Sequence, residues 1–469
     1  MKMKKLIFTG LVASLASALL FTSCSKSTTE TTTVSNPPLQ IGASVSDLAP
    51  LSGSIKGTML SGKTYTVSGD IIVNAGDTLL IQPGVKVYMG AGTNFAVKGT
   101  LLSLGTKDAP IWITAPNITK TDNPGADMTA DPAYSGKWCG INADTSCKLL
   151  VIKWTHIEFL GAKFTNAIIS GNKVGSSSVG IFFQNPNGLF VMEDSWVYGS
   201  VDDCMRPNGK FLIMRNTFEK IGAPGNGGDV INVKSGGSGD AAYNLIVGSA
   251  TNGTKASNKG GSTVQTNCNF YNNTYVHCGY KQPNPTGRAG SWNYEEGAKG
   301  LAYNGLVVNC RTGLRICISP IADTANIKYG YNYNYGDSQS LLNWVYPAAD
   351  LTIPQTTDIP AFTPAGYIWG QPMPVYTAPA NLVGANKPMF VNFPLPAAIN
   401  RLIDIQAVGN FDFHLQSGSP AIGKGNTNFQ PLSIAVNKVP VDKNYGATEI
   451  TLPGSDIGAY QSNGTGNQH

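Results

Sequence analysis

The amino-acid sequence predicts an all-β fold, built as a solenoid of short strands, and three observations lead to this prediction. Charged residues make up only 13% of the chain, against roughly 25% in typical soluble domains. The 54 glycines, together with many Asn, Ser and Thr residues, separate short β-branched and aromatic runs, as turns separate strands. Asparagines also recur at intervals of 28, 28, 32 and 28 residues, at Asn216, Asn244, Asn272, Asn304 and Asn332.

A period in this range indicates a solenoid, in which each unit buries its apolar face only against its neighbours. Because the units contain strand and glycine-turn patterns rather than helical ones, we expect a parallel β-helix with three sheets per coil. Asn tolerates the left-handed backbone conformation of a tight corner. We therefore expect the five asparagines to form a structural ladder, hydrogen-bonded from coil to coil about 4.8 Å apart.

A common strand register follows from three segments that end ten residues before a corner: "VGIFFQ", "VDDCMR" and "DVINVK". Alternation along a strand places Asp203 and Met205 on one face, and Asp202 and Arg206 on the other. The first face is mostly apolar in all three segments and would line the interior of the coil. This register predicts that Asp202 and Asp203 point to opposite faces, and that Arg206 and Lys234 stack one coil apart on the outside.

Residues 1–24 have the pattern of an export signal, with a basic "MKMKK", an apolar "LIFTGLVASLASALLF" and small residues before Cys24. The run "LFTSC" resembles the lipobox of bacterial lipoproteins. The resemblance implies lipidation of Cys24 and an outer-membrane location, facing the cell surface or the periplasm. Residues 25–48 are rich in Ser, Thr and Pro and are expected to form a flexible tether. Removing the signal lowers the net charge from +5 to +2 (5 − 3), which gives no electrostatic basis for nucleic-acid binding.

The rest of the chain is expected to form a parallel β-helix over 49–340, a Pro-rich irregular excursion over 341–400, and a closing coil with a C-terminal cap over 401–469. Four segments resemble surface lipoproteins of Bacteroidota that have the right-handed parallel β-helix (pectin-lyase-like) fold: "GDIIVNAGDTLLIQPGVKVYMGAGTNFAVKGTLLSLGTKDAPIWITA" (69–115), "GNGGDVINVKSGGSGDAAYNLIV" (225–247), "FDFHLQSGSPAIGKG" (411–425) and "DIGAYQ" (456–461). The resemblance implies the fold and the family, and it implies no particular activity.

The acidic residues raise an enzymatic alternative. β-Helix hydrolases that resemble polygalacturonases pair their aspartates with a Gly-His-Gly, but none of the four histidines here lies between glycines, which disfavours a hydrolase. The segments "SVDDCM" and "GNGGDVINVKSGG" resemble instead the calcium aspartates and the lysine strand of a pectate-lyase family. That resemblance implies Ca²⁺ held by Asp202, Asp203 and Asp229. Lys234 would be the base that takes the proton α to a uronate carboxylate, with Arg206 beside it.

A second candidate site lies in the longer segment "GRAGSWNYEEGAKG" (287–300). Insertions in a solenoid commonly mark its binding face, and exposed aromatic rings suit stacking on sugars. Trp292, Tyr294, Glu295 and Glu296 are therefore the candidate glycan-binding residues.

A P-loop formula is also present in "GTMLSGKT" (57–64). A phosphate-binding loop needs a helix after it, and strand and turn patterns follow here, so we expect no nucleotide. Seven cysteines follow Cys24, and an odd number implies at least one free thiol. Cys278 and Cys310 would stack on neighbouring coils, either paired or as buried thiols.

We therefore expect a monomeric, exported and lipid-anchored β-helix that binds glycans at the bacterial surface without catalysis and without a cofactor. A calcium-dependent polysaccharide lyase acting on uronates is the first alternative. An adhesin that recognises protein partners is the second.

Overall fold

The computed structural model describes residues 39–234, 236–260, 262–281, 290–317, 320–343, 380–395, 399–433 and 450–469. The export signal, Cys24 and residues 344–379 of the Pro-rich excursion lie outside the described residues. Within the described ranges, no helix is long and apolar enough to cross a membrane.

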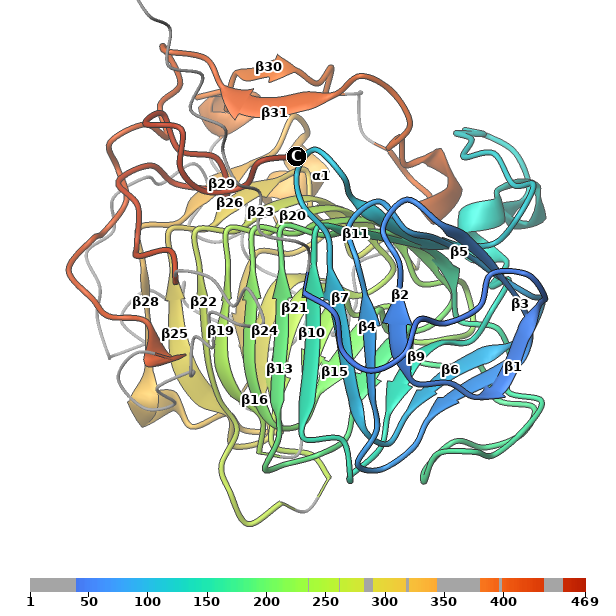
Figure 1. Cartoon of the computed structure of the whole chain (residues 1–469). Coiled ribbons are helices and arrows are strands. Elements are labelled where there is room, and N and C mark those ends of the chain that lie inside the picture. The colour runs from blue at the N-terminus through green and yellow to red at the C-terminus, as the bar shows by residue number, and fades with distance from the viewer. Residues whose placement is uncertain are drawn as a thin grey trace, which may run out of the picture. The chain divides into compact units, whose positions relative to one another are not determined.

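The chain folds as a parallel β-helix, as the sequence predicts, with strands stacked coil on coil (Figure 1). Three sheets run along the stack, and each coil contributes one strand to each sheet in turn. Sheet 1 consists of β2 (Gly57–Met59), β4 (Thr78–Ile81), β7 (Thr100–Leu104), β10 (Leu149–Lys153), β13 (Leu189–Glu193), β16 (Lys210–Met214), β19 (Ser238–Ala242), β22 (Asn267–Tyr271), β25 (Lys299–Tyr303) and β28 (Ile327–Gly330).

Sheets 2 and 3 meet at the long strand β3 (Thr64–Val73), whose first residues pair with β5 and whose last residues pair with β6. Strand β1 (Leu51–Ser54) also pairs with β3. Sheet 2 continues through β5 (Lys86–Met89), β8 (Ile111–Thr114), β11 (Thr155–Leu160), β14 (Trp196–Ser200), β17 (Thr217–Ile221), β20 (Leu245–Ser249), β23 (Thr274–Cys278), β26 (Leu306–Val308) and β29 (Tyr333–Tyr335). Sheet 3 continues through β6 (Asn94–Val97), β9 (Gly140–Ala143), β12 (Ile181–Phe183), β15 (Met205–Pro207), β18 (Ile231–Val233), β21 (Asn252–Ser257), β24 (Gly290–Glu295) and β27 (Leu314–Ile316).

The helices of the described residues are short and lie in the connections. They are α1 (Gln339–Leu342) and the 3₁₀ turns η1 (Met128–Ala130), η2 (Pro132–Tyr134), η3 (Thr324–Asn326), η5 (Ala380–Leu382) and η6 (Leu402–Asp404). Strands β30 (Phe390–Asn392) and β31 (Asp412–Leu415) form an antiparallel pair apart from the three sheets.

The interior of the coils is the hydrophobic core. In sheet 3, Met205 pairs with Ile181 on one side and with Ile231 on the other, and all three side chains are fully buried. The residues between the inward positions, such as Phe182 and Arg206, face outward and are partly exposed. The predicted alternation of inward apolar and outward mixed positions is therefore confirmed in these strands.

An asparagine ladder stabilises one corner of the stack, although its membership differs from the prediction. The side chain of Asn216 donates to Oδ1 of Asn244 (3.0 Å), and the side chain of Asn244 donates to Oδ1 of Asn273 (3.1 Å). Each Oδ1 also accepts the backbone N–H of the residue one coil before it. Asn332 accepts the backbone N–H of Gly305, which occupies the ladder position of its own coil.

Asn272 and Asn304 lie one residue before the ladder, and their placement within it was wrong. They occupy the left-handed corner position, with φ of 49° and 58°, and Asn304 donates to Asn272 (3.1 Å) in a second short ladder. In the other coils this left-handed position is taken by the residue before the ladder asparagine, namely Arg215, Tyr243 and Tyr331. The similar intervals between the five asparagines did not reveal this difference, because the ladder and corner positions are adjacent in sequence.

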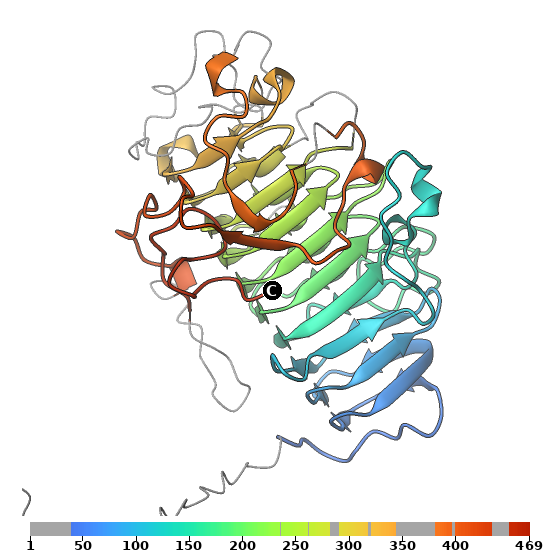
Figure 2. The ribbon, with the colours of Figure 1, turned by 90° about the horizontal axis from the view of Figure 1, so that it is seen from above.

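The C-terminal part of the chain does not add a closing coil to the described sheets, which corrects the prediction for 401–469. Instead it returns along the outside of the stack, over sheets 1 and 2 (Figure 2). The backbone N–H of Gly458 donates to the carbonyl of Asn304, and that of Ala459 donates to Oγ1 of Thr274. The outward positions of these sheets include apolar residues such as Val247 and Leu306, which need this cover.

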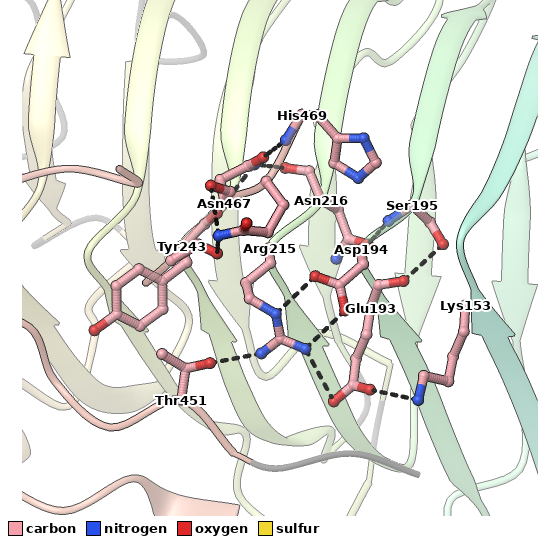
Figure 3. A network of polar contacts seen from close by, with 12 residues as sticks. Lys153, Glu193, Asp194, Ser195, Arg215, Asn216, Tyr243, Thr451, Asn467 and His469 are labelled. Carbon is pink, nitrogen blue, oxygen red and sulfur yellow. Dashed lines mark hydrogen bonds and ion pairs between the residues drawn. The ribbon is translucent and has the colours of Figure 1, made fainter. Parts of the chain in front are cut away.

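Arg215 joins this returning segment to the corner of the stack (Figure 3). Its guanidinium binds both carboxylate oxygens of Asp194 (2.7 and 2.9 Å) and Oγ1 of Thr451 (2.6 Å). The buried side chain of Asn467 donates to the carbonyl of Asn216 (3.0 Å). Bidentate Arg–carboxylate pairs fix geometry as well as adding energy, so Asp194 holds the Arg215 guanidinium in the position from which it binds Thr451 of the C-terminal segment.

The N-terminal end of the described chain is ordered against the β-helix. Residues 39–48 were assigned to the flexible tether, but this part packs on the first coil, where the backbone N–H of Val45 donates to the carbonyl of Thr58 (2.8 Å).

The cysteines of the described residues are all buried and free, and the backbone N–H of Cys278 donates to Sγ of Cys310 (3.3 Å). These two residues therefore stack on neighbouring coils as thiols.

Replacing Asn244 by Ala is expected to destabilise the protein by about 3 kcal/mol, because it leaves buried backbone and side-chain groups of two neighbouring coils without partners. The midpoint of urea unfolding, followed by circular dichroism, measures the effect. Asn187→Ala, at an exposed turn, is the matched control and should leave the midpoint unchanged. An Asn244→Ala midpoint equal to that of the control would contradict a stabilising role for the ladder.

Candidate functional site

The outward face of sheet 3 carries a straight column of polar side chains. Strand pairing aligns Met205 with Ile231, which places Arg206 beside Asn232 in the next coil. Asn232 pairs with Lys255, Lys255 with Asn293, and Asn293 with Arg315. Each of these residues lies between two inward-facing residues of its strand, so the pleat of the sheet directs all five to the outside.

A polar cavity of about 440 Å³ lies over this column. Five of its lining residues are acidic and five are basic, and they come from sheet 3 and from the loops before and after its strands. The charged residues are Asp202, Asp203, Asp229, Glu295, Glu296, Arg206, Lys234, Lys255, Lys259 and Arg315. The cavity therefore brings together every acidic and basic residue that the sequence singled out for catalysis, metal binding or glycan binding.

Asp203 organises the N-terminal end of the cavity. Its Oδ1 accepts the backbone N–H groups of Gly228 and Asp229 in the next coil, and its Oδ2 accepts the side chains of Arg206 (2.8 Å) and Asn232 (2.7 Å). Burial alone would raise the pKa of Asp203, but Arg206 and these hydrogen bonds outweigh it and lower the pKa. Asp203 is therefore a buried carboxylate that stays ionised.

Asp202 lies beside it and behaves differently. Its Oδ1 accepts the backbone N–H groups of Asp203 and Gly227 (2.8 Å each). Burial, and then the neighbouring charge of Asp203, raise the pKa of Asp202. A Cβ on Gly227 would clash with carboxylate oxygens of both aspartates. Gly227 is therefore required for this close approach of backbone to carboxylate.

Lys255 organises the centre of the cavity. Its ammonium forms an ion pair with Glu295 (2.7 Å) and lies 3.9 Å from Asp229. Burial would lower the pKa of Lys255, but Asp229 and Glu295 outweigh it and raise the pKa. The Lys255 charge outweighs the effect of burial on Glu295 in the same way, so the pKa of Glu295 is lowered. Glu296 accepts a hydrogen bond from the hydroxyl of Ser257 (2.6 Å) at the edge of the cavity.

Lys234 differs from the other cations of the cavity. No residue of the described ranges forms a hydrogen bond or an ion pair with its ammonium group. Burial, and then the positive charge of Arg206, lower the pKa of Lys234 from its ordinary value of 10.5. The neutral amine is the form that takes up a proton, so this environment favours a basic role for Lys234.

Two sequence predictions about this region were wrong. Lys234 does not stack on Arg206, because Asn232 holds that position and Lys234 lies two residues further along the chain. Asp202 and Asp203 do not point to opposite faces, since both line the same cavity. They precede β15 and belong to a turn, so strand alternation does not apply to them.

The aromatic half of the second candidate site was also wrong. Residues 290–295 form strand β24, in which Trp292 and Tyr294 point into the coil and are 0% exposed. The Tyr294 hydroxyl donates to backbone carbonyls inside the core, so neither ring is available to stack on a sugar. Glu295 and Glu296 do line the cavity.

The three aspartates proposed to hold calcium do not form a metal site. Ca²⁺ requires six to eight oxygen ligands with free lone pairs. The Oδ1 of Asp229 already accepts hydrogen bonds from Thr251 and Asn252, and both oxygens of Asp203 are occupied as described above. Among the described residues, no group of three His, Cys, Asp or Glu side chains is placed to hold a metal ion. The residues present therefore do not fit calcium, and Arg206 supplies the positive charge beside Asp203.

Sequence reasoning missed several cavity residues, chiefly Asn232, Lys255 and Arg315. A signal for them exists in five strand centres with one polar residue between two inward-facing ones: "MRP", "INV", "TKA", "WNY" and "LRI". Aligning these triplets, rather than counting back from the corner asparagines, gives the observed column.

No protein-family model matches this chain, and no curated protein matches it. Among solved structures, the chain is similar to one described as the crystal structure of pectate lyase Pel9A, with 14% sequence identity and a TM-score of 0.30. The similarity covers 83% of this chain and 88% of that one. At this level the similarity carries no information about activity, and membership of the Bacteroidota lipoprotein family stays a prediction.

Proposed function

We propose that this protein binds an acidic polysaccharide in the cavity over sheet 3, and that it does so at the bacterial surface. The observation that supports this most directly is the polar column of Arg206, Lys255 and Arg315 on the floor of the cavity. Arginine and lysine bind carboxylates through charge-assisted hydrogen bonds. Asn232, which lies between Arg206 and Lys255 and also lines the cavity, has an amide oxygen that can accept a hydrogen bond from a sugar hydroxyl.

The lining of the cavity favours a sugar over a protein partner. Interface cores on proteins are enriched in aromatic residues and depleted of charged ones, whereas this cavity is lined mainly by charged and amide side chains. The adhesin alternative therefore has less support from this site than glycan binding has.

Arg206→Gln is expected to weaken binding of uronate-containing oligosaccharides by roughly tenfold or more, since one charge-assisted contact is lost. Isothermal titration calorimetry against a panel of uronate and neutral oligosaccharides measures the change. Lys210→Gln, an exposed lysine of sheet 1, is the matched control and should bind as the wild type does. Equal affinity of the wild type for neutral and acidic oligosaccharides would contradict the proposal.

Attachment to the outer membrane is part of the proposal and is supported by the lipobox-like "LFTSC" that ends at Cys24. The Cys24→Ser variant is expected to move from the membrane fraction to the soluble fraction of cells that express it. Immunoblotting of the two fractions measures this. A Cys24→Ser variant that stays with the membrane as the wild type does would rule out lipidation at this residue.

Lyase activity is a second candidate, and the environment of Lys234 favours it. Within the described residues Lys234 has no hydrogen-bond or ion-pair partner, and its lowered pKa would let it take the proton α to a uronate carboxylate held in the cavity. Arg206 would pair with the carboxylate and so stabilise the negative charge that develops there. Because the aspartates do not fit calcium, we expect any such reaction to be independent of that metal.

The lyase candidate predicts an unsaturated product that absorbs ultraviolet light and forms equally well with added calcium or with a chelator. Lys234→Met should abolish its formation, whereas Lys210→Met should not affect it. Since the pKa of Lys234 is lowered, the neutral base forms below pH 10.5, so the rate should rise with pH and level off before that value. A uronate panel that binds without any such product would leave binding as the function and remove the lyase candidate.

A further inference from the structure

Along the column over sheet 3, positively charged side chains alternate with uncharged amides from coil to coil. Cations lie on the first, third and fifth strands of the column, at Arg206, Lys255 and Arg315, and amides lie on the two strands between, at Asn232 and Asn293. Neighbouring strands are about 4.8 Å apart, so successive cations are about 9.6 Å apart, and the whole column spans about 19 Å.

We propose that the polysaccharide bound here carries its acidic groups on alternate sugars, with neutral sugars between them. An extended pyranose chain advances by about one strand spacing per ring. A chain lying along the column would therefore place every second ring at a cation, and the intervening rings over the coils of Asn232 and Asn293, where the column carries no charge. This inference rests on the proposed function, and it specifies in addition the repeating unit of the bound polysaccharide.

The charges around the column support a sparse polyanion over a dense one. Arg206 is already paired with Asp203 at 2.8 Å, and Lys255 with Glu295 at 2.7 Å. The five acidic residues of the cavity balance its five basic ones. A polymer with a carboxylate on every ring would bring its additional charges close to the acidic walls at Asp202 and Glu296, where like charges repel in a medium of low dielectric.

The intervening positions are also chemically suited to neutral groups. Asn232 is 1% exposed and donates its amide N–H to Asp203, whereas Asn293 is 0% exposed, lies below the lining of the cavity and donates to Glu295 (2.9 Å). Both residues lack a charge that would compensate a carboxylate at that ring. Lys234 is the cation of the Asn232 coil, and it lies two residues further along the chain, outside the column.

The test compares hexasaccharides of three kinds by calorimetry on the wild-type protein: one alternating uronate with N-acetylhexosamine, one of uronate only, and one neutral. We expect the alternating ligand to bind at least tenfold more tightly than the other two. Equal or tighter binding of the all-uronate ligand would overturn the alternation and leave the proposed function standing. Binding of neither acidic ligand would overturn both.

A variant of Lys255, at the centre of the column, tests whether the column itself binds the alternating ligand. Lys255→Gln keeps a hydrogen-bond donor for Glu295 and removes the middle cation, so it should lower the affinity for the alternating ligand at least tenfold. Lys210→Gln on sheet 1 is the control. Should Lys255→Gln fail to fold, Arg206→Gln tests the same column from its end, and the wild-type ligand comparison decides the proposal in either case. Unchanged affinity in a folded Lys255→Gln would overturn it.

Discussion

The register between successive strands of sheet 3 determines where every residue of the cavity floor lies. Met205, Ile231 and Thr254 follow one another inside the coil, so the residue after each of them must face outward. A shift of one residue in any strand would exchange the inward and outward sets, and would bury Arg206 or Lys255 in an apolar core. The packing of the hydrophobic interior thus fixes where the outward-facing charged residues lie. Their spacing along the cavity is set by the spacing between neighbouring strands.

Within that frame, Arg206 supplies the positive charge that a metal ion would bring to the aspartate cluster, and it pairs with Asp203. The two oxygens of Asp203 accept four donors, two from the backbone of the next coil and two from side chains of the column. These contacts connect the turn before β15, the turn before β18 and the outward face of sheet 3. A carboxylate satisfied in this way has no lone pairs left for calcium. Its negative charge is compensated by Arg206. The same contacts keep Arg206 oriented toward the cavity.

The sequence was sufficient to predict the parallel β-helix, because alternation and a period near 28 residues are properties of the chain itself. The sequence identified residues that line the cavity more accurately than it identified how they are arranged there. Counting ten residues back from a corner misplaced Lys234, because the turn from sheet 3 to sheet 1 is not constant: it is 208–209 after β15, 234–237 after β18 and 258–266 after β21. Turn lengths follow from local loop structure rather than from the core pattern, so the corner asparagines are poor markers for sheet 3.

Trp292 and Tyr294 show the opposite failure, in which residue type was given more weight than pattern. In "GSWNYE" the aromatic residues alternate with Ser, Asn and Glu, which is the pattern of a half-buried strand. The same alternation directs Asn293 and Glu295 away from the core, so the inward direction of the two rings and the outward direction of their polar neighbours both follow from the pleat. An insertion in a solenoid indicates a longer coil, and the residues within it still obey the period of two.

The charge content of the cavity is itself evidence for function. Partly burying charged groups costs desolvation energy, and replacing paired buried charges by apolar residues is often neutral or stabilising. The outward faces of sheets 1 and 2 are covered by the returning C-terminal segment, which packs against apolar residues and also binds buried charged ones such as Arg215 and Asp240. Sheet 3 carries instead ten charged residues around one cavity, with Asp202 and Lys234 shifted in pKa toward their neutral forms. Shifted groups of this kind cluster at functional sites, and a cavity that combines them with a regular column of cations is suited to holding an extended anionic chain.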